Sequence, residues 1–84
     1  MESKLQSYVG NISTAVNFVN RSTRLIKAFW INYQGQRVFY FDVPPGQSHR
    51  QQTFVTHPWV ITDEADNCQS IYLPQTTETT YTIN

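Results

Sequence analysis

The stretch LIKAFWINY, residues 25–33, decides the fold class of this chain of 84 residues. Its residues alternate between two rows, and neighbouring side chains of a β-strand point to opposite faces of the sheet. The first row contains Leu25, Lys27, Phe29, Ile31 and Tyr33, and the second contains Ile26, Ala28, Trp30 and Asn32. The first row is the better candidate for the core. We therefore expect Trp30 to point the other way.

Turn residues divide the rest of the chain into further short runs rich in β-branched and aromatic residues. Gln34-Gly35 leads into a strand over residues 37–43. Pro44-Pro45-Gly46 ends that strand, because proline cannot donate to a sheet and glycine tolerates a positive φ. A first strand is expected after Thr14, and later strands are expected over residues 48–55, 59–62, 69–73 and 79–83. Seven strands at this spacing predict an all-β fold, an antiparallel β-sandwich.

A chain of this length forms one domain with a small core. It buries only about 60 to 65% of the surface that its unfolded chain exposes, so a few large side chains must supply the core. Within residues 37–43, Phe39 and Phe41 share one face, and Tyr40 lies on the other face, near Trp30. The expected core residues are Phe18, Phe29, Ile31, Phe39 and Phe41. We expect a flexible leader over residues 1–13 and one β-domain over residues 14–84.

Composition argues against several classes of partner. Lys plus Arg is 6 and Asp plus Glu is 6, so the net charge is zero and no field attracts nucleic acid or a membrane surface. No run approaches the roughly 18 apolar residues of a transmembrane helix. The single cysteine, Cys68, cannot form an internal disulfide, and the first eight residues carry charges where a signal peptide is apolar. We expect an intracellular protein.

Few residues suit catalysis or metal binding. His49, His57 and Cys68 are the only imidazole and thiol groups, and they lack the spacing of a metal site, so we expect no metal and no cofactor. Cys68 paired with His57 is a conceivable nucleophile, but a lone cysteine near a strand start is more often a small buried hydrophobe. Three acidic residues share one loop, which indicates solvation rather than acid–base chemistry: Asp63, Glu64 and Asp66. We expect no enzyme.

A cluster of aromatic and hydroxyl residues remains: Trp30, Tyr40, Thr53, His57 and Trp59. One interpretation is that its large rings are core residues. The other is that they line a ligand site, because Trp30 and Tyr40 lie on the less apolar rows of their strands, where large rings stay exposed unless something covers them. Flat rings with a few hydrogen-bonding tips are typical of a small binding pocket.

The order and spacing of several short motifs resemble the β-domain of the von Hippel-Lindau tumour suppressor family. The motifs are residues 18–24 (FVNRSTR), Trp30-Ile31-Asn32-Tyr33 with Gly35, Tyr40, Pro44-Pro45-Gly46, Thr53-Phe54 and His57-Pro58-Trp59. The segments 71–74 and 79–83 are similar to the last two strands of that domain. The resemblance implies a seven-stranded β-sandwich that recognises 4-hydroxyproline in a degron of the hypoxia-inducible factor α subunit. In the family, this domain is the substrate receptor of a cullin-type ubiquitin ligase that takes part in oxygen sensing.

The resemblance also implies roles for individual residues. Three residues match the aromatic walls of the hydroxyproline pocket: Trp30, Tyr40 and Trp59. His57 matches the histidine that hydrogen-bonds the hydroxyl, and Thr53 stands where the family has a serine that shares this hydroxyl. Phe54 replaces a tyrosine that makes a polar contact with the peptide. Gln52 replaces a histidine whose backbone contacts the peptide.

The family's ligase role depends on a helical domain that follows the β-domain and docks on elongin C. This chain has no helix-forming segment before Asn84, so we do not expect docking on elongin C. The sequence predicts a peptide-recognition module that binds a hydroxyproline-containing peptide or protein. The alternative is a β-sandwich scaffold for protein interactions without hydroxyproline selectivity.

Overall fold

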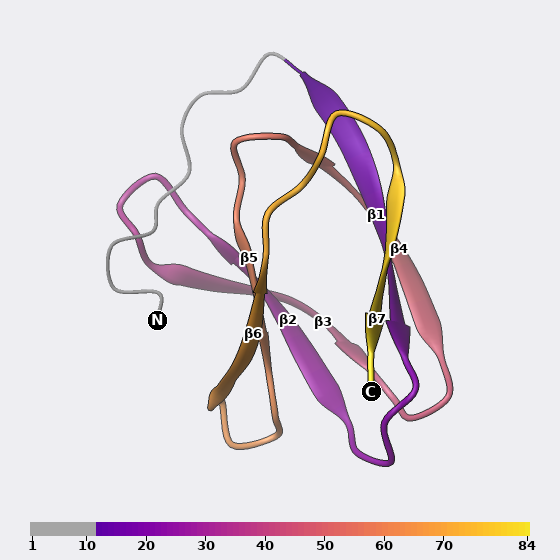
Figure 1. The fold of residues 1–84 in the computed structure, drawn as a ribbon. Helices are drawn as coiled ribbons and strands as arrows, with labels where there is room; N and C mark the ends of the chain where they lie inside the picture. The colour runs from indigo at the N-terminus through magenta and orange to yellow at the C-terminus, as the bar shows by residue number, and fades with distance from the viewer. Residues whose placement is uncertain (1–11) are drawn as a thin grey trace.

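The structure is a computed structural model that describes residues 12–84, and these residues form seven strands and no helix (Figure 1). The strands are β1 (Ser13–Asn20), β2 (Ile26–Ile31), β3 (Arg37–Val43), β4 (Ser48–Phe54), β5 (Trp59–Thr62), β6 (Cys68–Tyr72) and β7 (Thr79–Ile83). The expected strand ends are correct to within two residues. The leader expected over residues 1–13 lies outside the described residues, apart from its last two. Residues 12–84 contain no helix that could cross a membrane.

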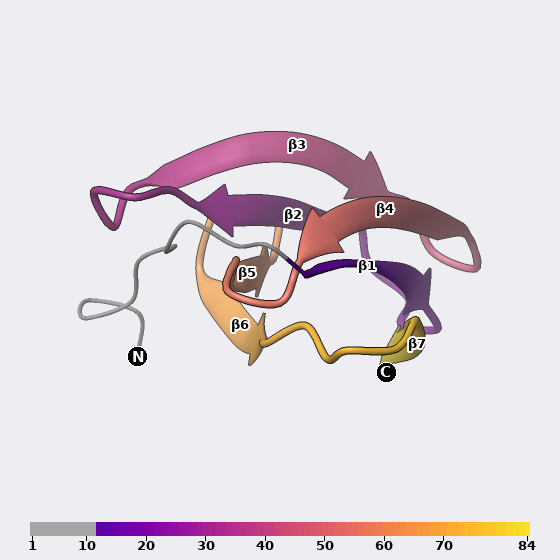
Figure 2. The ribbon, with the colours of Figure 1, turned by 90° about the horizontal axis from the view of Figure 1, so that it is seen from above.

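The strands form two sheets. One has the order β4-β1-β7 and the other has the order β3-β2-β5-β6 (Figure 1). Every neighbouring pair is antiparallel except β1 and β7, which run parallel, so the antiparallel fold that we expected is wrong at this pair. The chain reaches β7 from β6 in the other sheet rather than through a hairpin from β1 (Figure 2). Side chains alternate in the same way in both kinds of pair, so the sequence pattern cannot distinguish them.

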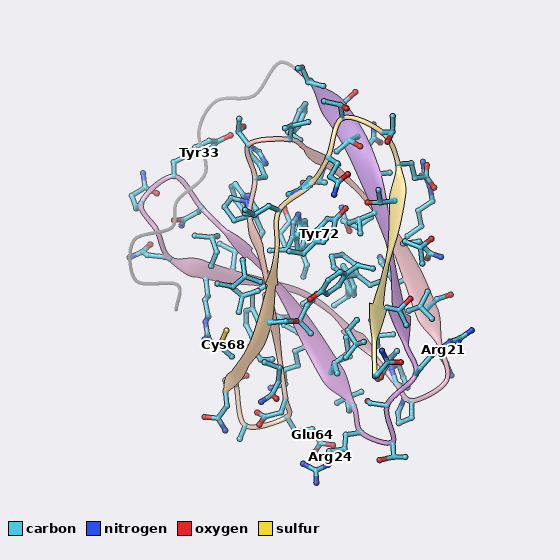
Figure 3. The ribbon with its side chains drawn as sticks, in the orientation of Figure 1. Arg21, Arg24, Tyr33, Glu64, Cys68 and Tyr72 are labelled. Carbon is cyan, nitrogen blue, oxygen red and sulfur yellow. The ribbon has the colours of Figure 1, made fainter. Side chains whose placement is uncertain are left out.

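The core lies between the two sheets and is centred on Phe18 of β1. The Phe18 ring is fully buried, and its centroid lies 5.7 Å from that of Phe41, 5.8 Å from that of Trp59 and 6.0 Å from that of Tyr72. These three partners belong to the four-stranded sheet, so Phe18 joins the two layers. Tyr72 is seen between the layers in Figure 3.

The row of β2 that faces the core is the opposite of the expected one. Ile26 and Ala28 are buried between the sheets, whereas Phe29 is half-buried on the other face. There it contacts Phe39, which is 53% exposed, and lies under the Arg37 guanidinium. The prediction that Phe29 and Phe39 are core residues is therefore wrong. The Phe29 ring packs against Phe39 and the Arg37 guanidinium rather than against the second sheet, an arrangement that a count of apolar residues in each row cannot foresee.

The other three core predictions agree better with the structure. Phe18 and Ile31 are fully buried, although Ile31 lies outside the cluster between the sheets. Phe41 is partly buried and packs against that cluster.

A buried asparagine fixes the place where the chain crosses from one sheet to the other. Asn20 Nδ2 donates to the carbonyls of Arg24 at 2.7 Å and Val43 at 2.8 Å, and its Oδ1 accepts from the backbone N–H and hydroxyl of Ser22. Gly46, with φ of 79°, donates from its backbone N–H to the Asn20 carbonyl at 2.8 Å. The positive φ expected of this glycine is confirmed.

Candidate binding site

A small cavity lies at the end of the two sheets where β2 and β4 finish and β5 begins. Its volume is about 150 Å³, and seven side chains line it: Trp30, Tyr40, Gln52, Thr53, Phe54, His57 and Trp59. We call this cavity the aromatic slot. The six residues singled out as binding residues in the sequence are all in its wall, together with Gln52.

Sheet register places the two tryptophans side by side in the slot. Trp30 of β2 is the direct partner of Trp59 of β5, and directly opposed residues share a face. Trp59 is 1% exposed and belongs to the core cluster, while Trp30 is partly buried and packs against it. Trp59 is thus both a core residue and a wall of the slot. The core interpretation of the aromatic cluster is therefore confirmed for Trp59, and the ligand-site interpretation stays a prediction.

A β-bulge aims Tyr40 into the slot. Ala28 pairs with Phe41 and Phe29 pairs with Phe39, so Tyr40 is an extra residue without a partner in β2. The bulge lets two consecutive side chains face the inner side, because Tyr40 and Phe41 both contact Trp59, at centroid distances of 5.0 Å and 6.2 Å. The expectation that Phe41 and Tyr40 lie on opposite faces is therefore wrong. The predicted proximity of Tyr40 and Trp30 is confirmed, because their ring centroids lie 6.3 Å apart.

The deep part of the slot is polar as well as aromatic. Thr53 is 4% exposed and His57 is 9% exposed. Trp59 Nε1 donates a hydrogen bond to Thr53 Oγ1 across 3.0 Å. This bond uses the acceptor side of the threonine hydroxyl and leaves its own proton able to donate. Buried hydroxyl and imidazole groups can give a ligand directional hydrogen bonds.

The rim of the slot is open to solvent. Tyr40 is 46% exposed and Phe54 is 38% exposed. The Phe54 ring lies 5.2 Å from the His57 ring, and the Trp30 ring lies 5.2 Å from His57 on another side. A ligand group that enters past the rim therefore meets aromatic surfaces before it reaches the buried hydroxyl and imidazole.

Size and charge limit what the slot can hold. The cavity volume of about 150 Å³ lies below the roughly 300 to 1,000 Å³ of typical small-molecule pockets. This space suits one side chain rather than a whole cofactor. No lining residue carries a carboxylate, ammonium or guanidinium group. Arg50, on the same strand as Thr53, is paired with Glu78, because its guanidinium donates to both Glu78 carboxylate oxygens and lowers the pKa of that carboxyl.

A second, larger cavity of about 670 Å³ lies at the opposite end of β1 and β2. It is lined by turn residues that include Arg21 and Arg24, and by the C-terminal end of β7. Figure 3 shows Arg24 and Glu64 at this end of the molecule. Among its lining side chains only Ile26 is buried, so the larger cavity offers a ligand no buried polar side chain. The buried Thr53 and His57 favour the smaller cavity as the candidate site.

The conceivable pairing of Cys68 with His57 is not formed. Cys68 pairs with Thr62, at the opposite end of β5 from Trp59, so it lies away from the slot. Across residues 12–84, no three His, Cys, Asp or Glu side chains gather in a group that could hold a metal ion.

One residue near the slot was not singled out from the sequence as a site residue. The hydroxyl of Tyr33 lies 3.3 Å from His57 Nε2, although Tyr33 does not itself line the slot. In Figure 3, Tyr33 lies in the turn between β2 and β3. The sequence signals were its position two residues before the turn glycine, Gly35, and its place in the motif that begins at Trp30.

Two packed sheets with an aromatic slot at one end define a small recognition domain. Comparison with protein families agrees with this class, because the family model of the VHL beta domain matches residues 5–79. The chain belongs to the VHL β-domain family. The VHL β domain is a substrate-recognition domain and not a known enzyme family.

Proposed function

We propose that this chain is a peptide-recognition module that binds a 4-hydroxyproline residue in the aromatic slot. The observation that carries the proposal is the placement of Thr53 and His57 in one cavity between Trp30, Tyr40 and Trp59. The pyrrolidine ring of proline is compact, neutral and small enough for one side-chain pocket, and aromatic faces bind such rings by area and dispersion. The two buried polar groups supply what a ring hydroxyl requires.

The hydroxyl adds contacts that plain proline cannot make. Thr53 Oγ1 already accepts from Trp59 and retains its proton for an acceptor, and a ring hydroxyl is both a donor and an acceptor. A net contribution of about 0.5 to 1.5 kcal/mol per hydrogen bond gives about 1 to 3 kcal/mol for two bonds. At about 1.4 kcal/mol per factor of ten, a preference of about five- to hundredfold for hydroxyproline follows.

The test is a titration by calorimetry with three pools of short peptides, identical except at a central residue. That residue is trans-4-hydroxyproline, proline or cis-4-hydroxyproline, and the flanking positions are randomised. We expect the trans form to bind about tenfold tighter than proline. We expect the cis form, whose hydroxyl leaves the opposite ring face, to bind no better than proline. Equal binding of the trans and proline pools would refute the proposal.

The alternative is an interaction domain that accepts proline without regard to the hydroxyl. One observation favours it: the buried polar groups already have partners within the chain. Thr53 accepts from Trp59, and His57 lies within hydrogen-bond distance of Tyr33. Groups that are already paired lose less when the ligand lacks a hydroxyl. Tight and equal binding of all three pools is the result that this alternative predicts.

A further inference from the structure

The turn between β2 and β3 is held in one conformation by a single asparagine side chain. Asn32 Oδ1 accepts from the backbone N–H of Gln34 at 2.9 Å and of Gln36 at 2.8 Å. The carbonyl of Asn32 accepts from Gly35, whose φ of 78° suits glycine. Side-chain bonds of this kind replace backbone pairing in a turn and restrict its motion. Tyr33 lies within this hydrogen-bonded turn, so its backbone is held in place.

From this turn, Tyr33 contacts two residues that line the slot, Trp30 and His57. Its ring meets the Trp30 ring edge-on, with centroids 5.6 Å apart and an interplanar angle of 86°. It meets the His57 ring in the same manner, at 5.6 Å and 84°. Its hydroxyl lies 3.3 Å from His57 Nε2. Tyr33 is not among the residues that line the cavity, so its effect on a ligand passes through His57.

We infer that Tyr33 is a positioning residue that fixes the ring orientation of His57 for reading the ligand hydroxyl, an inference that rests on the proposed function. A histidine ring has a broad, roughly two-fold χ2 preference, and the two flipped orientations occupy nearly the same space. A flip would exchange Nε2 with a ring carbon and break the bond to Tyr33. The Tyr33 hydroxyl can donate to Nε2 or accept from it, so the bond can form with either tautomer of the ring. Tyr33 therefore selects the ring orientation that the slot presents.

Tyr33→Phe tests this role, because it removes the hydroxyl and keeps the ring that packs on Trp30. The matched control is Tyr81→Phe, which removes a tyrosine hydroxyl at the opposite end of the sheets, beside the larger cavity. The first readout is the ratio of affinities for the hydroxyproline and proline pools. The second is the ¹⁵N chemical shifts of the histidine ring nitrogens, which respond to the loss of a hydrogen bond at Nε2. The chain has two histidines, so His49 serves as an internal reference.

We expect Tyr33→Phe to lower the hydroxyproline preference about three- to tenfold, the equivalent of one hydrogen bond. Affinity for the proline pool should not change, the His57 ring signals should shift, and those of His49 should stay. Tyr81→Phe should leave all of these quantities at their original values. A fall in affinity for both pools alike would indicate a damaged wall and would refute the positioning role.

Failure of this inference and failure of the proposed function give different results. A preference in the unsubstituted protein that survives intact in Tyr33→Phe would overturn the role of Tyr33 alone. Absence of any preference in the unsubstituted protein would overturn the proposed function and, with it, the reading role of Tyr33.

Discussion

Trp59 Nε1 donates to Thr53 Oγ1 across 3.0 Å, and this bond joins the core of the domain to its candidate site. Trp59 packs on Phe18 between the sheets, and Thr53 ends the inner row of β4. The bond holds two strands from different sheets at the base of the slot. The shape of the slot and the stability of the fold are therefore coupled at this pair.

Removal of the Thr53 hydroxyl should affect both properties. Thr53→Val keeps the shape of the side chain and leaves the buried Trp59 N–H without its acceptor, which costs about 1 to 3 kcal/mol of unfolding free energy. Urea denaturation measures this loss. Thr53→Ser is the control, because it keeps the oxygen, and it should retain most of the stability and the hydroxyproline preference. A Thr53→Val protein as stable as the original would show that the bond contributes nothing.

Two substitutions in the slot should have different effects on peptide binding. His57→Ala removes a hydrogen-bonding group, so it should reduce binding of the hydroxyproline pool towards that of the proline pool. Tyr40→Ala removes a wall that is 46% exposed, so it should weaken both pools by a similar factor without unfolding the domain. Titration of both variants with both pools separates these effects. The same pattern in both variants would contradict the assigned roles.

Asn20 should be among the most sensitive positions outside the slot. Asn20→Asp keeps the size of the side chain but removes the donor that serves the Arg24 and Val43 carbonyls, and it buries a carboxyl group. The expected cost is roughly 2 to 5 kcal/mol of unfolding free energy. Asn17→Asp on the same strand is the control, since Asn17 is only partly buried and pairs in register with Arg50. Equal stability of the two variants would exclude a structural role for the Asn20 amide.

Two phenylalanines test which faces of the strands form the core. Phe18→Ala should cost about 3 to 5 kcal/mol, because the ring is fully buried and a cavity remains. Phe39→Ala should cost less than about 1 kcal/mol, because Phe39 is 53% exposed. Thermal or urea unfolding of both variants gives the comparison. A loss of unfolding free energy for Phe39→Ala as large as that for Phe18→Ala would mean that the faces of β3 are reversed.

The candidate site could be assembled from the sequence to a considerable extent, but not its geometry. The six expected residues do surround one cavity. Their proximity depends on the partnering of Trp30 with Trp59 and on the bulge at Tyr40, and neither feature has a sequence signal of its own. The contact of Tyr33 with His57 joins residues 24 positions apart and could not be foreseen.

The sequence by itself determined the number of strands, their approximate ends and the turn at Gly46, because alternation and turn residues act over a few neighbouring positions. The tertiary structure alone decided which row of β2 faces inwards, how Phe29 and Phe39 are covered and that β7 runs parallel to β1. These features depend on how surfaces from distant segments fit together. An isolated strand contains its own alternation but not the shape of the sheet that will cover it.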